Sequence, residues 1–493
     1  MFSPEEPEFL PRAVGSATSH AIAHPDKRTS VWYHVRGGGK RMSCQKVVIL
    51  DGRGPVDRDL SPVLGALSDV LGSDGALIET CRLHEMKLAH CLGCFGCLLK
   101  TPGMCVEDDD GRRVAKAVIQ SDTTVLFTPV TFGGYSPDLK KMMDRFIQLI
   151  SPYFEVEHSE VHHPPRYAHR PRLVMVGTQR RPHAHEAHIF KTLAGRNAIN
   201  FHPPSYAAEV VAATDPAEAL RRCFEALLAR SDSLPFGEAA ASLMPPPVAS
   251  GIATGEDGPR QALLIVGSPK TSSPSTSSVL GSYLLELLGE RGWETESLTL
   301  RANLNREEGE AALLASVDRA GLVLLVFPLY ADALPYLVTR ALATISAHRQ
   351  RSVLPTPQRL VAIVNSGFPE TLQNAVALAI CEEFASQSGM RWSGGLALGG
   401  GGIVGEQPLN AAKRSGLPVE HVIEALDLTA EALSEGRPVP AQAVNLMTKN
   451  PLAWMPFALY RWIYTRFGGK GFEKEAAKNG VSRERLLDQP YAA

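Results

Sequence analysis

Short apolar runs recur along the chain, and most are followed by a stretch with apolar residues at helical spacing. In the first half the runs are KVVILDG, TTVLFTP and RLVMVGT, at 46–52, 123–129 and 172–178. The helical stretches of this half lie at 58–72, 109–120, 137–150 and 215–229. Continuous apolar strands that alternate with helices are typical of a parallel sheet covered on both faces. We therefore predict an α/β fold for this half.

The same pattern returns in the second half of the chain. Its apolar runs are ALLIVGS, GLVLLVFP and RLVAIVNS, at 262–268, 321–328 and 359–366. Its predicted helices lie at 276–291, 308–320, 334–348, 370–386 and 418–435. The recurrence indicates an internal repeat of about 200 residues. We interpret the chain as two copies of one α/β domain, each with a parallel sheet of about five strands.

Composition marks the borders of the two copies. Residues 232–260 are dominated by Pro, Gly, Ala and Ser, which predicts a linker. Residues 1–44 are polar and lack periodicity, which predicts disorder. The predicted organisation is a disordered segment 1–44, a first domain 45–231, a linker 232–260, a second domain 261–440 and a helical C-terminal extension 441–493.

The overall charge excludes some classes of partner. The chain has 493 residues, with 50 Lys+Arg and 52 Asp+Glu, so no basic excess points to nucleic acid. No apolar run reaches the roughly 18 residues of a membrane span, and we find no signal-peptide pattern. We therefore expect a cytoplasmic protein, in which thiols stay reduced. Clustered cysteines then favour metal or redox roles over disulfides.

Four of the eight cysteines lie in HCLGCFGCLLKTPGMC, between His90 and Cys105. The candidate metal ligands are Cys91, Cys94, Cys97 and Cys105. Three cysteines at three-residue steps, with a fourth after a loop, can surround a small iron–sulfur cluster. The same four thiolates suit a zinc ion, and each CxxC pair suits redox-active thiols without metal. The spacing leaves these three interpretations open.

The stretch VGSPKTSSPSTSS (266–278) follows a buried strand and opens a helix. Its hydroxyls, together with the free N–H groups and positive dipole end of the helix, predict a site for a phosphate monoester. It is neither a Walker A loop nor a GxGxxG fingerprint. The corresponding stretch of the first half, DGRGPVDRDLSP (51–62), lacks this run of hydroxyls. Its Asp51, Asp57 and Asp59 would repel a phosphate, although Arg53 and Arg58 offer compensation.

Several loops resemble those of the flavodoxin-like NAD(P)H-dependent FMN reductases. They are GSPK with the following STSS, FPLYADALPYLVTRAL (327–342), FTPVTFGGYSPDLKKMMDRF (127–146) and NSGFPE (365–370). The cysteine loop resembles that of the iron–sulfur flavoproteins, a branch of this family. The resemblance covers about residues 46–440. It implies two flavodoxin-like, doubly wound domains in tandem, FMN as cofactor, NAD(P)H as co-substrate and a 4Fe–4S cluster on the cysteine loop.

The resemblance also implies the FMN-binding residues. Those of the second half are Ser268, Lys270, Ser275, Thr276, Ser277, Pro328, Leu329, Tyr330, Asp332, Asn365 and Gly367. Those of the first half are Thr128, Pro129, Val130, Thr131, Phe132, Gly133 and Gly134. Because the second half has the better phosphate loop, we expect FMN there and leave the first half open. Family members often dimerise around the flavin, which implies an internal pseudo-dimer here and a possible homo-oligomer.

We expect an FMN-dependent oxidoreductase that takes hydride from NAD(P)H and passes electrons to an unidentified acceptor. Hydride transfer needs no dedicated general base, so we name no catalytic residue. Two alternatives remain: an electron-transfer flavoprotein that docks a redox partner, and a metal-binding protein with vestigial flavin loops. HHPPRY (162–167) is expected to line the flavin cleft or to be a solvated insertion, and HAHEAH (183–188) is a weaker metal candidate. The aromatic stretch 451–472 is expected to pack on the protein rather than on a membrane surface.

Overall fold

The computed structural model describes residues 45–492 with six gaps, at 74, 238–240, 249–258, 271–273, 352–357 and 450–454. The predicted disordered segment and part of the predicted linker lie outside the described residues. Residues Cys44–Ala493 form one compact unit of the chain, and everything below concerns that unit.

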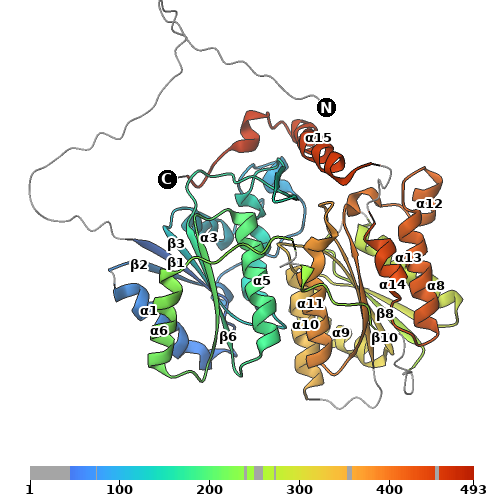
Figure 1. Cartoon of the computed structure of the whole chain (residues 1–493), viewed down its shortest axis with the longest axis horizontal. Coiled ribbons are helices and arrows are strands. Elements are labelled where there is room, and N and C mark those ends of the chain that lie inside the picture. The colour runs from blue at the N-terminus through green and yellow to red at the C-terminus, as the bar shows by residue number, and fades with distance from the viewer. Residues whose placement is uncertain are drawn as a thin grey trace, which may run out of the picture. The chain divides into compact units, whose positions relative to one another are not determined.

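The first half forms a parallel five-stranded sheet. Its strands are β1 (Lys46–Asp51), β2 (Leu77–Arg82), β3 (Thr123–Pro129), β6 (Arg172–Gln179) and β7 (Tyr206–Ala212), in the order β2-β1-β3-β6-β7. Its main helices are α1 (Ser61–Ser73), α3 (Asp110–Ile119), α4 (Pro137–Met143), α5 (Ala184–Phe201) and α6 (Ala217–Ala229). In Figure 1, α1 and α6 lie on one side of this sheet and α5 on the other. Burial on both faces explains the nearly unbroken apolar sequence of β1 and β3.

The second half repeats this arrangement. Its strands are β8 (Gln261–Val266), β9 (Glu294–Thr299), β10 (Leu322–Pro328), β11 (Arg359–Asn365) and β12 (Arg391–Leu398), in the order β12-β11-β10-β8-β9. Its helices include α8 (Thr276–Glu290), α9 (Glu307–Arg319), α10 (Tyr336–Arg349), α11 (Ala375–Gln387) and α13 (Glu420–Ser434). In both sheets the strands lie side by side in the order second, first, third, fourth and fifth, counted along the chain. This is the flavodoxin order. The predicted tandem of two flavodoxin-like domains is confirmed.

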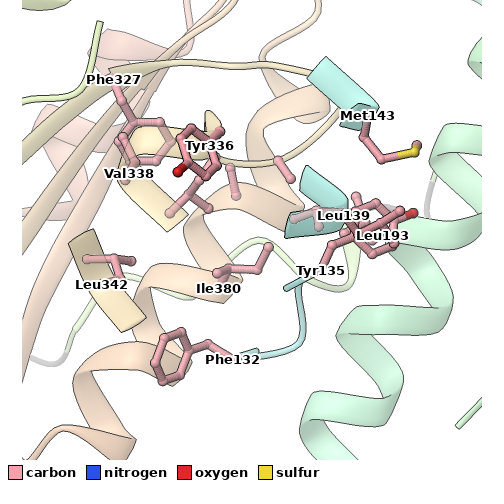
Figure 2. Close-up of a cluster of buried hydrophobic side chains, with 14 of the residues drawn as sticks. Phe132, Tyr135, Leu139, Met143, Leu193, Phe327, Tyr336, Val338, Leu342 and Ile380 are labelled. Carbon is pink, nitrogen blue, oxygen red and sulfur yellow. The ribbon is translucent and has the colours of Figure 1, made fainter. Parts of the chain in front are cut away.

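One hydrophobic core joins the two domains. Helices α4 and α5 of the first domain contact α10 and α11 of the second. The buried side chains between them form a single cluster that includes Leu139, Leu193, Leu342 and Ile380, as Figure 2 shows. Phe132 packs edge-to-face on Phe384 of α11, with the ring centroids 5.2 Å apart. The pairing of equivalent helices resembles the interface of a dimer folded into one chain.

Two further segments lie around the ends of the strands. The insertion after the first-domain α4 forms a short antiparallel hairpin, β4 (Glu155–Glu157) and β5 (Glu160–His162). The C-terminal extension contains α14 (Ala441–Met447), α15 (Phe457–Lys478) and a 3-10 turn at Glu484–Leu487. Helix α14 packs on α13 and β12, whereas α15 contacts β4 and the short helix α2 (Gly96–Leu99) of the cysteine loop. In the part of the chain described, every helix is too short or too polar to cross a bilayer.

The contact between Phe132 and Phe384 allows a test of whether the two domains share one hydrophobic core. Phe384→Ala removes a fully buried ring that the other domain contacts, so we expect the free energy of unfolding to fall by about 3–5 kcal/mol. Urea titration followed by circular dichroism measures this. Phe467→Ala, at a phenylalanine that is 47% exposed on α15, is the matched control and should cost about 0.5 kcal/mol or less. Equal losses in the two variants would contradict a shared core.

Candidate functional site

A cavity of about 300 Å³ opens where the two domains meet. The second domain contributes the loop after β10 through Leu329, Tyr330 and Asp332, and the loop after β11 through Ser366–Phe368. The first domain contributes Cys91 and Gly93 of the cysteine loop, and the end of α5. Both second-domain loops lie at the carboxyl ends of their strands, where open α/β sheets bind ligands. The cavity therefore combines the predicted flavin loops of one domain with the predicted metal loop of the other.

The predicted phosphate loop follows β8, which lies next to β10 in the sheet. Gly267 follows β8, and a side chain there would meet Val338 and Phe327 at 2.3 and 2.8 Å, so only glycine fits the turn. Ser275 caps helix α8 in a capping box with Ser278. The first turn of α8 contains no acidic residue, which leaves its positive dipole end uncompensated. The start of α8 thus combines hydroxyl side chains with a positive dipole end, and its role as a phosphate site stays a prediction.

Hydrogen bonds connect the phosphate loop to the cavity. The Ser277 hydroxyl donates to Asn365 Oδ1 at 2.7 Å, and the next residue, Ser366, lines the cavity. Thr276 donates to the carbonyl of Gly401. Ser268 is buried, and Lys270 contacts Glu406 near the mouth of the loop. The predicted second-domain residues are therefore contiguous, from the helix terminus to the loops after β10 and β11.

The loop after β10, which we call the ring loop (residues 328–333), is a tight turn. Tyr330 and Ala333 exchange two backbone hydrogen bonds of 3.0 Å. Ala331 and Asp332 have φ angles of 46° and 56°, in the left-handed region that L-residues rarely adopt. Lys140 of α4 donates to the Tyr330 carbonyl at 2.9 Å and pairs with Asp144. Contacts from the first domain thus hold the ring loop in a strained conformation.

Asp332 provides the strongest of these contacts. Its carboxylate pairs with Arg196 of α5, whose Nε lies 3.2 Å from Oδ1, and it also accepts from Asn200. Arg196 also pairs with Glu160 of the hairpin, with 2.5 Å between Nη1 and Oε2. All three charged side chains are buried. Arg196 and Glu160 were not among the predicted site residues, and no motif in the sequence marks them.

Aromatic side chains surround the outer part of the cavity. Phe368 of the loop after β11 lies near His163 and Phe154, with centroid distances of 5.3 and 6.1 Å. Tyr464 and Phe472 of α15 complete this group, which was not predicted apart from His163. Burial lowers the pKa of His163 to about 4, so this ring is neutral at pH 7. Of the HHPPRY segment only His163 lines the cavity, and α15 contributes Tyr464 and Phe472 to its wall.

The cysteine loop lies against the ring loop. Gly93 has a φ of 64°, and a side chain at this position would meet the Tyr330 hydroxyl at 2.1 Å. Cys91 lines the cavity, Cys97 is buried beneath it, and Cys94 is exposed and accepts from the Gly96 N–H at 3.4 Å. Cys105 is held by its N–H bond to Gln148 Oε1 at 3.0 Å. The four predicted ligands therefore lie in one loop at the edge of the cavity.

The geometry of the four cysteines distinguishes among the three interpretations. A zinc ion holds its thiolates about 3.8 Å apart, because each lies about 2.3 Å from the metal. Among the described residues, the one trio with ligand atoms within 4.8 Å of one another is Glu155, Glu157 and His202, so these sulfurs are spread more widely. Burial raises the pKa of Cys91 to about 12 and also raises that of Cys97, opposite to what a redox-active thiol needs. The four sulfurs therefore do not form a compact zinc site in this structure, and a cluster on this loop stays a prediction.

The first-domain residues predicted for FMN lie elsewhere. None of Thr128, Pro129, Val130, Thr131, Phe132, Gly133 and Gly134 lines this cavity. The turn at Thr131–Gly134 has the same pair of backbone hydrogen bonds as the ring loop. Here, however, a side chain at Gly133 would meet Ile189 at 2.5 Å, and Phe132 is buried against Phe384. Part of this turn borders a separate, wider cavity of about 780 Å³ with Arg180 and Arg181.

Carboxylates fill the first-domain equivalent of the phosphate loop. Asp57 accepts from the Gly54 N–H at 2.9 Å, in the position where an anion would bind. Arg180 pairs with Asp57 and Asp59, at 2.9 Å in each case. Arg53 pairs with Asp51 at 2.8 Å rather than remaining available to a ligand. The donors of this loop are thus already used by acidic side chains of the same loop.

The second histidine motif does not form a compact metal site in the described structure. His183 caps α5 and lies 3.6 Å from Glu383 of α11, and His185 lies 3.8 Å from the same carboxylate. These contacts join the two domains at the surface. In this structure the HAHEAH segment therefore contributes contacts between the two domains.

Residues 46–212 match the family model described as NADPH-dependent FMN reductase. An iron–sulfur flavoprotein of Archaeoglobus fulgidus is 31% identical over 87 residues, which are 18% of this chain and 39% of that protein. One of Methanocaldococcus jannaschii is 30% identical over 100 residues, 20% of this chain and 51% of that protein. The chain thus spans about half, or less, of the curated relatives it matches. Residues 46–212 are therefore similar in sequence to the NADPH-dependent FMN reductases.

Solved structures of flavoproteins resemble a single domain of the chain. An NAD(P)H:quinone oxidoreductase from Methanothermobacter marburgensis is 15% identical, covers 37% of this chain and 98% of its own, and has a TM-score of 0.29. An FMN-dependent NADH-azoreductase from Bacillus anthracis is 13% identical, covers 35% and 99%, and has a TM-score of 0.27. The fold assignment rests on the strand orders given above.

His163 gives a pH-dependent test of the cavity. The unfolded chain binds a proton near pH 6.5, whereas the folded chain does so only near 4, so stability should fall as the pH drops from 6.5 to 4. The loss through His163 is about 3 kcal/mol. Urea titrations at pH 7 and 4.5 should show a smaller loss for His163→Asn than for the wild type. The exposed His169→Asn is the control, and a loss in His163→Asn as large as in the wild type would contradict this burial.

Proposed function

We propose that the chain is an oxidoreductase that binds one FMN in the cavity between its two domains. The observation that carries this proposal is the meeting of three loops at that cavity: the ring loop and the loop after β11 of the second domain, and the cysteine loop of the first. The phosphate loop does not line the cavity but is hydrogen-bonded to the loop after β11 through Ser277 and Asn365. The match of residues 46–212 to the family model supports the proposal, because that segment includes the whole cysteine loop. The relatives named as iron–sulfur flavoproteins support it further.

The second-domain residues suit FMN in their chemistry. Ser268, Ser275, Thr276 and Ser277 would hold the phosphate with the N–H groups of α8, and Lys270 would lie near the mouth of the loop. Pro328, Leu329, Tyr330 and Asp332, with Asn365 and Gly367, would hold the ring through backbone amides and one aromatic side chain. When bound, FMN accepts a hydride and can release its electrons singly.

The surrounding residues would orient the ring and exclude water. Lys140 and Arg196 fix the two ends of the ring-loop turn, through the Tyr330 carbonyl and the Asp332 carboxylate. Phe368, Phe154 and Tyr464 would shield the outer face of the site. Neutral His163 donates through Nδ1 to the Tyr153 carbonyl at 2.8 Å, which fixes its ring at the cavity wall. The residues around the cavity thus supply position and a dry environment rather than acid–base catalysis.

We propose further that Cys91, Cys94, Cys97 and Cys105 would hold a 4Fe–4S cluster beside this FMN. No three of these sulfurs lie within 4.8 Å of one another, which disfavours a zinc ion, and the raised pKa values of Cys91 and Cys97 disfavour redox-active thiols. The four-cysteine spacing and the similarity to the iron–sulfur flavoproteins favour a cluster. The cluster would take electrons singly from the flavin and pass them to an acceptor, with NAD(P)H as the hydride donor. Homo-oligomerisation of the whole chain stays a prediction.

The phosphate site gives a direct test. Thr276→Glu places a carboxylate at the first residue of α8, where it favours the helix dipole but repels a phosphate. We expect FMN affinity to fall more than tenfold, measured by quenching of flavin fluorescence. Ser61→Glu places the same charge at the first residue of α1, the equivalent position of the first domain, and should leave FMN affinity unchanged. A loss in Ser61→Glu instead would move the FMN site to the first domain.

Reduction by NAD(P)H distinguishes the proposed oxidoreductase from an electron-transfer flavoprotein without a small-molecule substrate. An electron carrier that docks a redox partner would have the same FMN site but no useful reaction with a nicotinamide. We expect anaerobic stopped-flow mixing with NADPH or NADH to bleach the flavin absorbance of the purified chain. A flavin that dithionite reduces but neither nicotinamide does would favour the carrier.

A further inference from the structure

Arg166 is a buried arginine for which the described residues provide no carboxylate partner. Its side chain is 3% exposed. Nε donates to the carbonyl of Ile150 at 3.1 Å, and Nη1 donates to the carbonyls of Leu486 and Asp488 at 2.7 and 2.9 Å. Nη2 is buried and has no hydrogen-bond partner within the described ranges. The Asp488 carboxylate pairs instead with Arg485 at the surface.

The other two buried arginines around the site also have an unpartnered Nη2, but unlike Arg166 each of them forms an ion pair with a carboxylate. Arg145 pairs with Asp109 at 2.6 Å, and Arg196 pairs with Glu160 and Asp332. An uncompensated guanidinium in a protein interior costs several kcal/mol. Burial accordingly lowers the pKa of Arg166. The Asp488 carboxylate interacts with this charge but forms no ion pair with it in the described structure, so a closer negative partner would stabilise the guanidinium.

The cysteine loop lies beside Arg166, because Leu486, whose carbonyl accepts from Arg166, packs with Leu99 of that loop. Cys97 is the neighbouring titratable sulfur, and the two groups interact electrostatically in both directions. As a thiol Cys97 is neutral, so the pair gains little from this contact. Four thiolates around an iron–sulfur core carry net negative charge, which increases by one on reduction. A cluster on this loop therefore supplies the partner that Arg166 lacks.

The C-terminal strap, residues 484–492, holds Arg166 in this position. Its carbonyls accept the two Nη1 bonds, and Gln489 donates to the Arg166 carbonyl at 2.7 Å. A side chain at Gly103 of the cysteine loop would meet Pro490 at 2.6 Å. Tyr491 donates to Gln148 Oε1 at 3.0 Å, the same oxygen that accepts from the Cys105 N–H. The strap thus contacts the cysteine loop and the arginine together.

We propose that Arg166 is the buried counter-charge of the cluster and raises its reduction potential, and that the C-terminal strap positions it. This inference rests on the proposed cluster. A fixed positive charge stabilises the reduced, more negative form more than the oxidised form, so it favours electron transfer onto the cluster. Arg166 would act through the cluster and would not contact substrate. It is therefore a positioning residue and not a catalytic one.

The test compares three variants of the full chain, each reconstituted anaerobically with iron and sulfide. Arg166→Gln removes the charge, Arg166→Lys retains it, and Arg170→Gln is the control. Arg170 lies in the same segment and also donates to backbone carbonyls, but it faces no cysteine. The readouts are iron per chain and the reduction potential from an EPR-monitored titration.

We expect Arg166→Gln to shift the reduction equilibrium about tenfold toward the oxidised form, which for one electron is 59 mV. Arg166→Lys should recover most of the potential, and Arg170→Gln should match the wild type. Failure of Arg166→Gln to load iron, together with normal iron loading of Arg166→Lys, would also support the proposal. An unchanged potential in a fully loaded Arg166→Gln, or equal losses in the glutamine and lysine variants, would overturn it. A wild-type chain that binds no iron would instead overturn the cluster itself.

Discussion

The ion pair between Arg196 and Asp332 is the constraint on which the site depends. It joins the first domain to the turn of the ring loop, at a point where both side chains are buried. Buried ion pairs contribute little net stability, but breaking one leaves an uncompensated charge, so the arrangement of the two domains is strongly specified. The left-handed backbone at Ala331 and Asp332 persists because this contact and Lys140 hold it. The first domain therefore fixes the conformation of the ring loop where it lines the cavity.

Duplication has given the two copies different tasks. In the second copy the loops after β10 and β11 line a cavity. In the first copy, carboxylates occupy the corresponding phosphate loop, and Phe132 and Gly133 pack into the shared core. The first copy instead contributes the cysteine loop and the side chains that fix the ring loop. We propose that one asymmetric site replaces the two equivalent sites that a symmetric dimer would have.

The sequence predicted the central strands and the loops after them, because a run such as LVLLVF can only be buried on both faces. It did not reveal β2 or β9, whose sequences LIETCR and ETESLT are largely exposed edge strands with little apolar pattern. The predicted helix at 137–150 ends as an α-helix at Met143 and continues as a 3-10 turn through Leu149. Arg196, Phe368 and Tyr491 could not be found, since their roles arise from contacts between segments far apart in the chain. Arg166 stood inside HHPPRY, but only its burial distinguishes it from a surface arginine.

The stoichiometry of cofactors in the purified chain tests the central claim most directly. Flavin, iron and zinc would be quantified together with an anaerobic absorption spectrum. The account predicts one FMN per chain, about four irons and no zinc, because one phosphate loop is open and four thiolates lie in one loop. Two FMN per chain would contradict the division of labour between the copies. Absence of flavin would contradict the site itself.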